Sequence, residues 1–349
     1  MNLPINPTII VTSADSKFFK LVQGTILSIR EKPQGCSVDI GFLDLGCTPE
    51  QLQWIGQHVD HIVEPGWNYD VLNSGSYPNY LKALISRPFL PNYFPGYEVY
   101  IWIDADAWVQ DWSAIDSLIQ GALLKGFSIV PQLLDNMLNP HPLLLARFLY
   151  SSYLTFCPDL DYRIDSNNLY IRPVLNAGVF SMARGSKIIE LWKESLSQAI
   201  LRGALGVFVD QFTLNSVIYK DWGVERVTLL PICCNWTVHS MLPLWDPLRK
   251  LWVEPWPPYK PIGILHLTTS EIKRKMTHIV QTTDGSKVEA SLCYFSSQMS
   301  PVKKYDYISP SQRRIYLDCS FPFMTVVDPS SNPWPYLRKE VPHLWYADL

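Results

Sequence analysis

Val99-Tyr-Ile-Trp-Ile-Asp-Ala-Asp-Ala-Trp-Val109 is an apolar run that contains two aspartates, Asp104 and Asp106. The β-branched and aromatic residues of its first half predict a buried strand. Because strand side chains alternate between the faces of a sheet, Asp104 and Asp106 point the same way where the strand opens into a loop. Two carboxylates are costly to bury unless they bind a cation or another partner, so this strand is predicted to end in a polar cleft. Carboxylate oxygens suit Mg²⁺ or Mn²⁺.

An Asp-x-Asp tripeptide is common by itself, and its simplest interpretation is a loop with two solvated acids. Here it directly follows an apolar strand, about a third of the way along the chain. That position favours a metal site over a solvated loop.

Composition narrows the class of protein. The chain has 349 residues, of which 47% are hydrophobic and 17% are charged, as is typical of a well-packed globular protein. A net charge of −3 gives no support for nucleic-acid binding, which would need a clustered basic surface. No apolar run has the length of a membrane span, and residues 1–7 lack the basic and apolar regions of a signal peptide. We therefore expect a cytoplasmic protein.

Strands and helices alternate along most of the chain. Strands are predicted at 8–12, 37–43, 61–63, 99–103, 127–131, 173–182, 227–231 and 262–267, and helices at 18–29, 49–55, 77–90, 113–124, 186–201 and from 210 onward. This order indicates an α/β fold with a mostly parallel sheet flanked by helices. Ligands of such sheets bind beyond the carboxyl ends of the strands, where Thr12, Ser13 and Asp15 join Asp104 and Asp106.

Three segments are predicted from changes in pattern. Residues 1–270 form the main domain, and the irregular stretch 133–172 is an insertion over its cleft. Residues 271–349 are a C-terminal extension, which starts with basic residues and then becomes rich in Pro and Tyr. It is interpreted as a subdomain, an arm along the main domain, or a partner surface. Peripheral contact with a membrane through this extension is a further expectation.

Other polar positions allow two interpretations each. Lys82 and Arg87, just upstream of the first quoted strand, can meet a phosphate or a carboxylate, or belong to a solvated helix face. Gly178 inside a strand marks a bulge or a close approach by a ligand. Asp210 at a helix start is an ordinary N-cap or a site residue. A lone histidine is usually structural, but His266 ends a strand, and Mn²⁺ accepts imidazole beside oxygen.

In this order the pieces resemble a GT-A fold, Rossmann-like nucleotide-sugar glycosyltransferase, most closely glycosyltransferase family eight, from Thr8 to about Lys275. The resemblance rests on Thr12-Ser-Ala-Asp15, Trp102-Ile-Asp-Ala-Asp-Ala-Trp-Val109, Asn176-Ala-Gly-Val-Phe180, Asp210-Gln-Phe-Thr-Leu-Asn215, Leu230-Pro followed by Asn235-Trp236, and a strand that ends in His266. The family closes with His-x-x-Gly-x-x-Lys-Pro-Trp, whereas His266-Leu-Thr-Thr-Ser-Glu-Ile-Lys273 lacks the glycine and the Pro-Trp.

What this resemblance implies is a hexosyltransferase that retains anomeric configuration. Its donor is a nucleotide sugar, a UDP-sugar, and its acceptor is a glycan, a lipid-linked sugar or a small glycoside. Mn²⁺, or Mg²⁺, holds the donor diphosphate and is bound by Asp104, Asp106 and His266. Donor contacts are implied at Thr12, Ser13, Asp15, Lys82, Asp104, Ala105 and Lys273, and positions around the transferred sugar and reaction centre at Asn176, Asp210 and Gln211.

Two other functions stay open. A sugar nucleotidyltransferase on a related sheet would also use carboxylates and Mg²⁺, but Thr12-Ser-Ala-Asp15 stands where a Gly-rich phosphate loop would follow the first strand. A noncatalytic nucleotide-sugar or glycan-binding protein is favoured by the altered closing motif, while the intact set of two aspartates and His266 speaks against it.

The stereochemical outcome of the reaction and the residues that contact the acceptor also remain open. Retention needs a group such as Asp210 or Gln211 beneath the anomeric carbon, whereas inversion needs an Asp or Glu base near the acceptor hydroxyl. Trp236, Trp245 and Trp256 either stack on sugar faces or belong to the core.

Overall fold

The computed structural model describes residues 7–73, 77–132, 173–203, 206, 208–268 and 277–294, and the backbone of 303–305. The predicted insertion at 133–172, Lys273, the predicted boundary near residue 270 and most of the C-terminal extension lie outside the described residues. Contacts group residues 1–305 into one compact unit and 306–349 into another. All described residues belong to the first unit.

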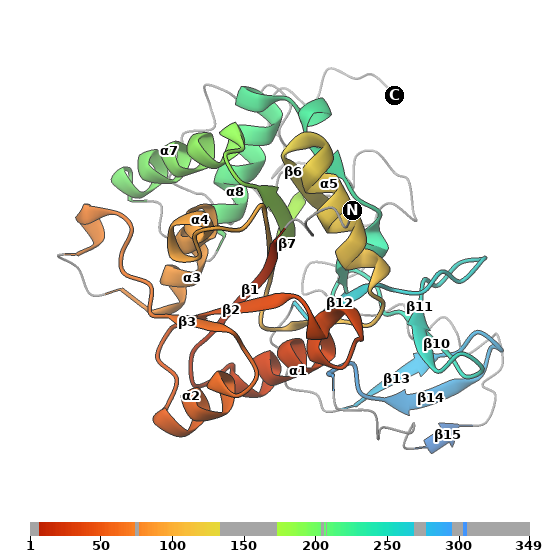
Figure 1. Ribbon diagram of the computed structural model, residues 1–349. Helices are drawn as coiled ribbons and strands as arrows, with labels where there is room; N and C mark the ends of the chain where they lie inside the picture. Colours follow the sequence, from red (N-terminus) through yellow and green to blue (C-terminus); the bar gives the residue numbers. More distant parts are fainter. Residues whose placement is uncertain are drawn as a thin grey trace, which may run out of the picture. The chain divides into compact units, whose positions relative to one another are not determined.

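A seven-stranded sheet forms the centre of this unit, in the order β3-β2-β1-β4-β7-β6-β8 (Figure 1). Every neighbouring pair is parallel except those that include β7, which runs antiparallel to β4 and to β6. The predicted α/β fold with a mostly parallel sheet is therefore confirmed. The strands are β1 (Thr8–Ala14), β2 (Asp39–Asp44), β3 (His61–Val63), β4 (Val99–Ile103), β6 (Phe127–Pro131), β7 (Leu175–Ala183) and β8 (Thr228–Leu229).

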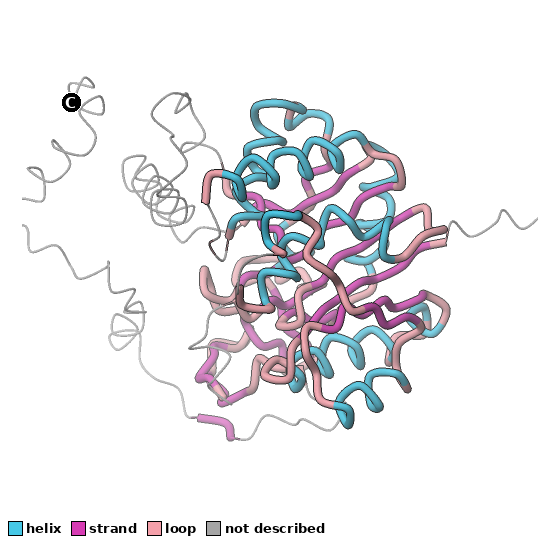
Figure 2. Tube along the Cα trace, turned by 90° about the vertical axis from the view of Figure 1, so that its left-hand side faces the viewer, coloured by secondary structure: helices cyan, strands magenta, loops and turns pink. Residues whose placement is uncertain are grey.

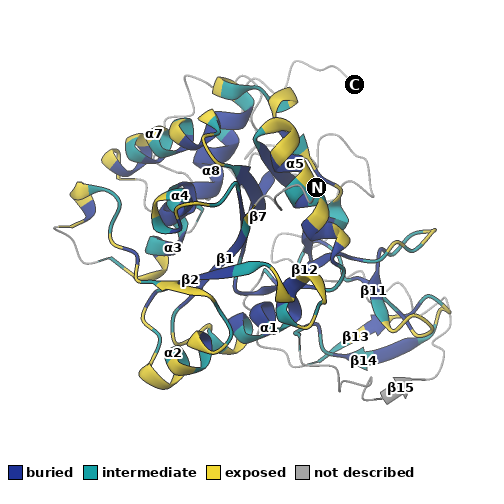
Figure 3. Cartoon of the chain, viewed as in Figure 1, coloured by how far each residue is buried: buried dark blue, intermediate teal, exposed yellow. Residues whose placement is uncertain are grey.

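Helices cover both faces of the sheet, and Figure 2 shows the strands running between them. One face carries α1 (Phe19–Arg30), α2 (Pro49–Gly56) and α5 (Ser113–Lys125). The other carries α3 (Tyr80–Ser86), α4 (Leu90–Tyr93), α7 (Lys187–Leu201) and α8 (Val209–Ser216). Strand alternation divides the core accordingly, since Ile9 and Val11 pack with the second group while Ile10 and Ala14 pack with the first. Figure 3 shows β1 and β7 mostly buried and the outer helix surfaces exposed.

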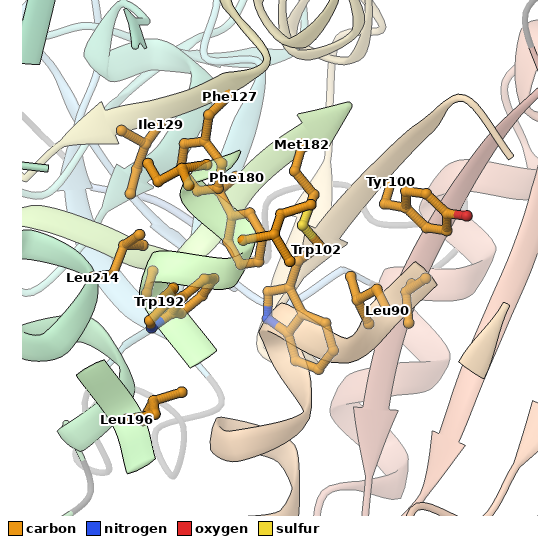
Figure 4. Packing of buried hydrophobic residues seen from close by; sticks show 14 of the residues in the cluster. Leu90, Tyr100, Trp102, Phe127, Ile129, Phe180, Met182, Trp192, Leu196 and Leu214 are labelled. Carbon is orange, nitrogen blue, oxygen red and sulfur yellow. The ribbon is translucent and has the colours of Figure 1, made fainter. Parts of the chain in front are cut away.

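Aromatic packing fixes the middle of the sheet against α7 (Figure 4). Phe127 of β6 stacks on Phe180 of β7 at 5.5 Å between ring centroids, and Phe180 meets Trp192 of α7 edge-on at 5.4 Å. Trp102 of β4 lies in the same cluster. Burying each such ring stabilises the fold by about 1.5–3 kcal/mol. The cluster thereby holds β4 and β7, which both lead into the candidate site, side by side.

The helix predicted at 77–90 is shorter than expected. α3 ends at Ser86, and the chain continues as a 3-10 turn at Arg87–Phe89 before α4 begins. Pro88 explains the difference, because proline lacks the backbone N–H that an α-helix would use. The turn leaves Arg87 only 6% exposed, on the inner side of the molecule.

The strand that ends at His266 lies in a second, smaller sheet. In that sheet β12 (Ile264–His266) pairs antiparallel with β5 (Ala107–Val109) and parallel with β9 (Trp236–Thr237). Ala107 lies opposite His266 in this pairing. The loop from β4 to β5 therefore joins the two sheets, and it contains both aspartates of the quoted stretch.

Further strands follow the second sheet: β10 (Leu244–Asp246), β11 (Leu251–Val253), β13 (His278–Gln281), β14 (Lys287–Ala290) and β15 (Lys303–Tyr305). Short turns of 3-10 helix lie at Gln34–Cys36, Asp70–Leu72, Val224–Arg226 and Ile232–Asn235, and a π-helical turn lies at Val217–Trp222. Val280 and Val288 pack in a third core with Trp236 and Leu265, so β13 and β14 cover the second sheet. Among the described residues, no helix combines the length and apolar character that crossing a membrane requires.

Candidate active site

The three residues predicted as metal ligands lie together beyond the carboxyl end of β4. Asp104, Asp106 and His266 each offer a ligand atom, and these atoms lie within 4.8 Å of one another. His266 Nε2 is 3.4 Å from Asp106 Oδ1 and 3.8 Å from Asp104 Oδ2. Asp106 and His266 are buried, and Asp104 is partly exposed. The cluster is therefore open to the outside through Asp104.

Backbone hydrogen bonds from three strands hold the loop that carries the aspartates. The Asp104 N–H donates to Gly178 O of β7 at 2.8 Å, and the Ala107 N–H donates to Asp104 O at 2.9 Å, which closes a tight turn. On the other side the Leu267 N–H, directly after β12, donates to Asp106 O at 2.9 Å. Both carboxylates therefore project from a fixed main chain.

Two polar side chains of α1 support the same loop from the inside. Thr25 Oγ1 lies 2.9 Å from Ala105 O and 2.7 Å from Ala107 O. Ser28 Oγ accepts a 2.9 Å hydrogen bond from the Val109 N–H. Sequence reasoning missed both residues because it considered only the apolar period of this helix. A signal was present, since two small hydroxyl residues three positions apart share one helix face.

The absence of a side chain at Gly178 leaves space for the side chains of the cluster. A Cβ atom at this position would lie 2.3 Å from His266 Cε1 and 2.7 Å from Asp104 Oδ2. The register of β7 against β6 also shifts next to it, from the Ile129–Phe180 pair to the Val130–Asn176 pair. The predicted bulge is confirmed, and the groups that closely approach Gly178 are the side chains of His266 and Asp104.

Arg87 joins two carboxylates of the site. Its Nη2 lies 2.5 Å from Asp104 Oδ1, and its Nη1 contacts Asp210 Oδ2. The guanidinium lies over the ring of Trp102, 5.0 Å from the ring centroid, and Trp102 Nε1 also donates to Asp104 Oδ1 at 2.7 Å. Protein donors thus bind Oδ1 of Asp104, and its Oδ2 faces His266.

The charges of these groups do not balance by themselves. Burial raises the pKa of Asp210 even though Arg87 lies against it, while Asp104 and Asp210 raise the pKa of Arg87 in spite of its burial. The guanidinium of Arg87 contacts the carboxylates of Asp104 and Asp210, and Asp106 lies in the same cluster as Asp104. When all three are ionised, the carboxylates outnumber this guanidinium, and a divalent cation would neutralise the excess. Two carboxylates and one imidazole also form a suitable donor set for Mn²⁺ or Mg²⁺.

Asn176 and Gln211, predicted near the reaction centre, bind the backbone of β7 and a neighbouring side chain. Asn176 Oδ1 accepts from the Gly178 N–H at 2.9 Å and from Asn235 Nδ2 at 3.0 Å. Gln211 Oε1 accepts from the Ala177 N–H at 3.0 Å. Both residues thus help to shape the bulged part of β7 beside the ligand cluster.

The predicted donor residues of β1 divide between the two faces of the sheet. Ser13 follows Val11 on the face where Trp102 and Asp104 also lie, because β1 and β4 pair in parallel with Val11 opposite Trp102. Thr12 lies on the other face, and its buried Oγ1 has no hydrogen-bond partner among the residues that the structure describes.

The other predicted site residues have local partners. Asp15 Oδ1 accepts from the backbone N–H groups of Lys17 and Phe18, so it closes the turn before α1. Lys82 lies over the ring of Trp67, with 5.5 Å between its Nζ and the ring centroid. Arg87, five positions further, is the cation that reaches Asp104.

The tryptophans proposed to stack on sugars pack mainly against other rings. Trp236 has no exposed surface, so of its two predicted roles the core position is confirmed and sugar stacking is wrong. Its ring lies 5.6 Å from that of Trp256. Trp245 meets Trp252 edge-on at 5.1 Å. All four rings belong to the third core or pack against it.

A polar network that sequence reasoning missed lies beside His266. His239 Nδ1 is 2.6 Å from Thr268 Oγ1, and its Nε2 is 2.8 Å from Gln132 Nε2. Burial, together with the nearby His266, lowers the pKa of His239 to about 4. Gln132 and Thr268 directly follow the strands predicted at 127–131 and 262–267, which was the available signal, whereas no predicted strand precedes His239.

Comparison with known proteins finds similarity to solved structures alone. No family model and no curated protein matches it. It is similar to the solved structure of the galactosyltransferase LgtC in complex with donor and acceptor sugar analogs, at 14% identity and a TM-score of 0.45 over 75% of this chain and 87% of that one. For the bifunctional glycosyltransferase WbbM the identity is 16% and the TM-score 0.46, over 77% of this chain and 47% of that one. For mouse xyloside xylosyltransferase 1 the identity is 10% and the TM-score 0.47, over 76% of this chain and 98% of that one.

Proposed function

We propose that this chain is a metal-dependent glycosyltransferase that moves a sugar from a UDP-sugar to a saccharide or glycoside acceptor, with retention of anomeric configuration. The observation that carries this proposal is the cluster of Asp104, Asp106 and His266. It lies beyond the carboxyl end of β4, at the edge where open parallel sheets bind their ligands.

The cluster suits the donor diphosphate. Asp104 Oδ2, Asp106 and His266 Nε2 would hold Mn²⁺ or Mg²⁺. A divalent cation bound there would neutralise the charge that grows on the diphosphate as the glycosidic bond breaks. Arg87 holds Asp104 by its other oxygen and so keeps Oδ2 turned toward His266. We assign the base of the donor to the end of β1, where Ser13 shares a face with Asp104.

The partners that the carboxylates of this cluster already have support retention of anomeric configuration. Among the described residues of this cluster, Asp104 and Asp106 belong to the proposed metal centre and Asp210 is paired with Arg87. This set leaves no carboxylate for the acceptor-side base of an inverting enzyme. Gln211 Oε1 is also occupied, by the Ala177 N–H. We therefore favour front-face substitution, in which the acceptor oxygen attacks from the leaving-group side and the departing diphosphate oxygen takes its proton.

The test is donor turnover. The protein is incubated with a panel of UDP-, GDP- and CDP-sugars in the presence of Mn²⁺, Mg²⁺ or EDTA, and release of the nucleoside diphosphate is measured. We expect metal-dependent release with a UDP-sugar that Asp106→Asn abolishes and Asp116→Asn, an exposed position on α5, leaves unchanged. Proton NMR of the transferred sugar reports its anomeric configuration. Metal-dependent donor binding without turnover by any acceptor or water would instead favour the noncatalytic alternative.

A further inference from the structure

We infer that Asn235 is a positioning residue that fixes the tautomer of His266, so that His266 Nε2 presents a lone pair to the carboxylates of Asp104 and Asp106. The role of the tautomer in metal binding rests on the proposed function. The tautomer itself is inferred from hydrogen bonds among groups of this chain. Asn235 is 2% exposed and makes contacts on both sides of its amide.

The direction of the network is set by a backbone N–H. The Gly178 N–H points at Asn176 Oδ1 over 2.9 Å, and a main-chain N–H can only donate. The atom of Asn176 that receives it must therefore be the carbonyl oxygen. A flipped Asn176 amide would place two donors against each other, so the orientation of this side chain is determined.

The same reasoning orients Asn235. Its amide approaches Asn176 Oδ1 at 3.0 Å, and since that atom is an acceptor, the Asn235 atom facing it must be Nδ2. The opposite atom of the amide is then Oδ1, and it lies 2.9 Å from His266 Nδ1. An amide oxygen only accepts, so His266 Nδ1 must carry a hydrogen.

In the neutral imidazole, a hydrogen on Nδ1 leaves Nε2 with its lone pair. Nε2 is the ring nitrogen that faces Asp106 Oδ1 at 3.4 Å and Asp104 Oδ2 at 3.8 Å. A lone pair directed at two carboxylates is unfavourable without a cation and favourable with one. Partners that fix the second nitrogen of a ligating histidine typically contribute 10–100-fold to metal affinity.

The local fold places Asn235 for this contact. It is the last residue of the 3-10 turn at Ile232–Asn235 and directly precedes β9. Because β9 runs parallel to β12, with Trp236 opposite Leu265, Asn235 lies beside the strand that carries His266. The Gly263 N–H donates to Cys233 O at 2.8 Å and ties the turn to the start of the same strand.

The first test uses the metal-free protein. The tautomer of His266 is read from ¹⁵N NMR of histidine-labelled protein at alkaline pH, and its signals are assigned from His266→Gln. We expect the Nδ1–H form in the wild type. Free histidine favours the Nε2–H form in water, so an Nε2–H signal for His266 in the wild-type protein overturns the inference without any further variant.

Variants then separate positioning from folding. Asn235→Leu removes both halves of the amide, and we expect His266 to lose its Nδ1–H preference and the affinity for Mn²⁺ to fall about 10–100-fold. Asn235→Asp keeps an acceptor for the Nδ1 hydrogen, so the tautomer should stay as in the wild type. The matched control is Asn215→Leu, at a buried asparagine that binds the backbone of Leu175, for which the tautomer should not change.

The outcomes also distinguish this inference from the proposed function. If Asn235→Leu folds with an unchanged tautomer and wild-type affinity for Mn²⁺, the inference is wrong. If the wild type binds no Mn²⁺ but shows the Nδ1–H tautomer, and that tautomer is lost in Asn235→Leu, Asn235 positions His266 as inferred and the metal-dependent function fails.

Discussion

Arg87 and Asp210, 123 positions apart in the chain, form an ion pair in which the side chains are 7% and 1% exposed. A buried pair of this kind is weak as a source of stability, because both charges lose their hydration. The pair instead fixes the position of Arg87, which also binds Asp104 and thereby connects α8 to the candidate metal centre.

Removing one partner of this pair should cost more than removing both. Arg87→Met leaves Asp210 buried without its cation, and we expect a loss of about 3–5 kcal/mol in the free energy of unfolding. Adding Asp210→Asn should restore most of that loss. Urea denaturation of the wild type, both single variants and the double variant measures the coupling. Simple additivity of the two single effects would show that the ion pair is not energetically coupled.

Gly178→Ala should disturb the site more than the fold. The new methyl group meets His266 Cε1 and Asp104 Oδ2 at 2.3 and 2.7 Å, so these side chains must move apart. We expect a destabilisation of about 1–3 kcal/mol and a fall in Mn²⁺ affinity of about 10-fold or more. Calorimetric titration measures the affinity. Gly66→Ala, where an added Cβ meets no atom of the described residues within 4 Å, is the control and should bind Mn²⁺ as the wild type does.

Thr25→Val tests whether α1 supports the loop of the two aspartates. The substitution keeps the shape of the side chain but removes the hydroxyl that contacts Ala105 O and Ala107 O. We expect a loss of about 1–3 kcal/mol in stability, together with weaker Mn²⁺ binding. Thr228→Val removes one comparable hydrogen bond, to Gly121 O, away from the loop. If both variants bind Mn²⁺ equally well, the support from α1 does not reach the site.

His239 should make stability depend on pH. Its pKa is lowered from the ordinary value of 6.5 to about 4 in the folded protein, chiefly by burial. Below pH 6.5 the unfolded chain therefore binds a proton that the folded protein does not, and stability present at neutral pH is lost as the pH falls through this window. The loss amounts to about 3 kcal/mol. The unfolding free energy should fall less between neutral pH and pH 4 in His239→Gln than in the wild type, by about this amount. An equal fall in both proteins would contradict this role of His239.

Local sequence signals predicted the frame of the molecule well. The apolar run before Asp104 is β4, and the alternation of strands and helices gives the mostly parallel sheet. The helix predicted at 49–55 is α2, and Thr48 before it forms a capping box with Gln51. These features depend on neighbouring residues and on side-chain period, so they can be read without knowledge of distant contacts.

The interior of the site depends on contacts between distant segments, and these were not predictable in the same way. Arg87 turns inward only because Pro88 ends α3 and because Asp210 lies across the core from it. Strands β5, β9 and β12 have two or three residues each, too few for a period to reveal their pairing. The burial of Trp236 follows from that pairing and from the cover that β13 and β14 supply.

The most direct test of the proposed metal centre is pulsed electron paramagnetic resonance of Mn²⁺ added to the protein with UDP. Histidine is labelled with ¹⁵N, and the couplings of the manganese to ¹⁵N and to the ³¹P nuclei of UDP are recorded together. We predict both couplings on one manganese centre, with the nitrogen coupling lost in His266→Gln. Mn²⁺ that shows neither coupling in the presence of UDP, or a nitrogen coupling that persists in His266→Gln, would contradict the proposed metal centre.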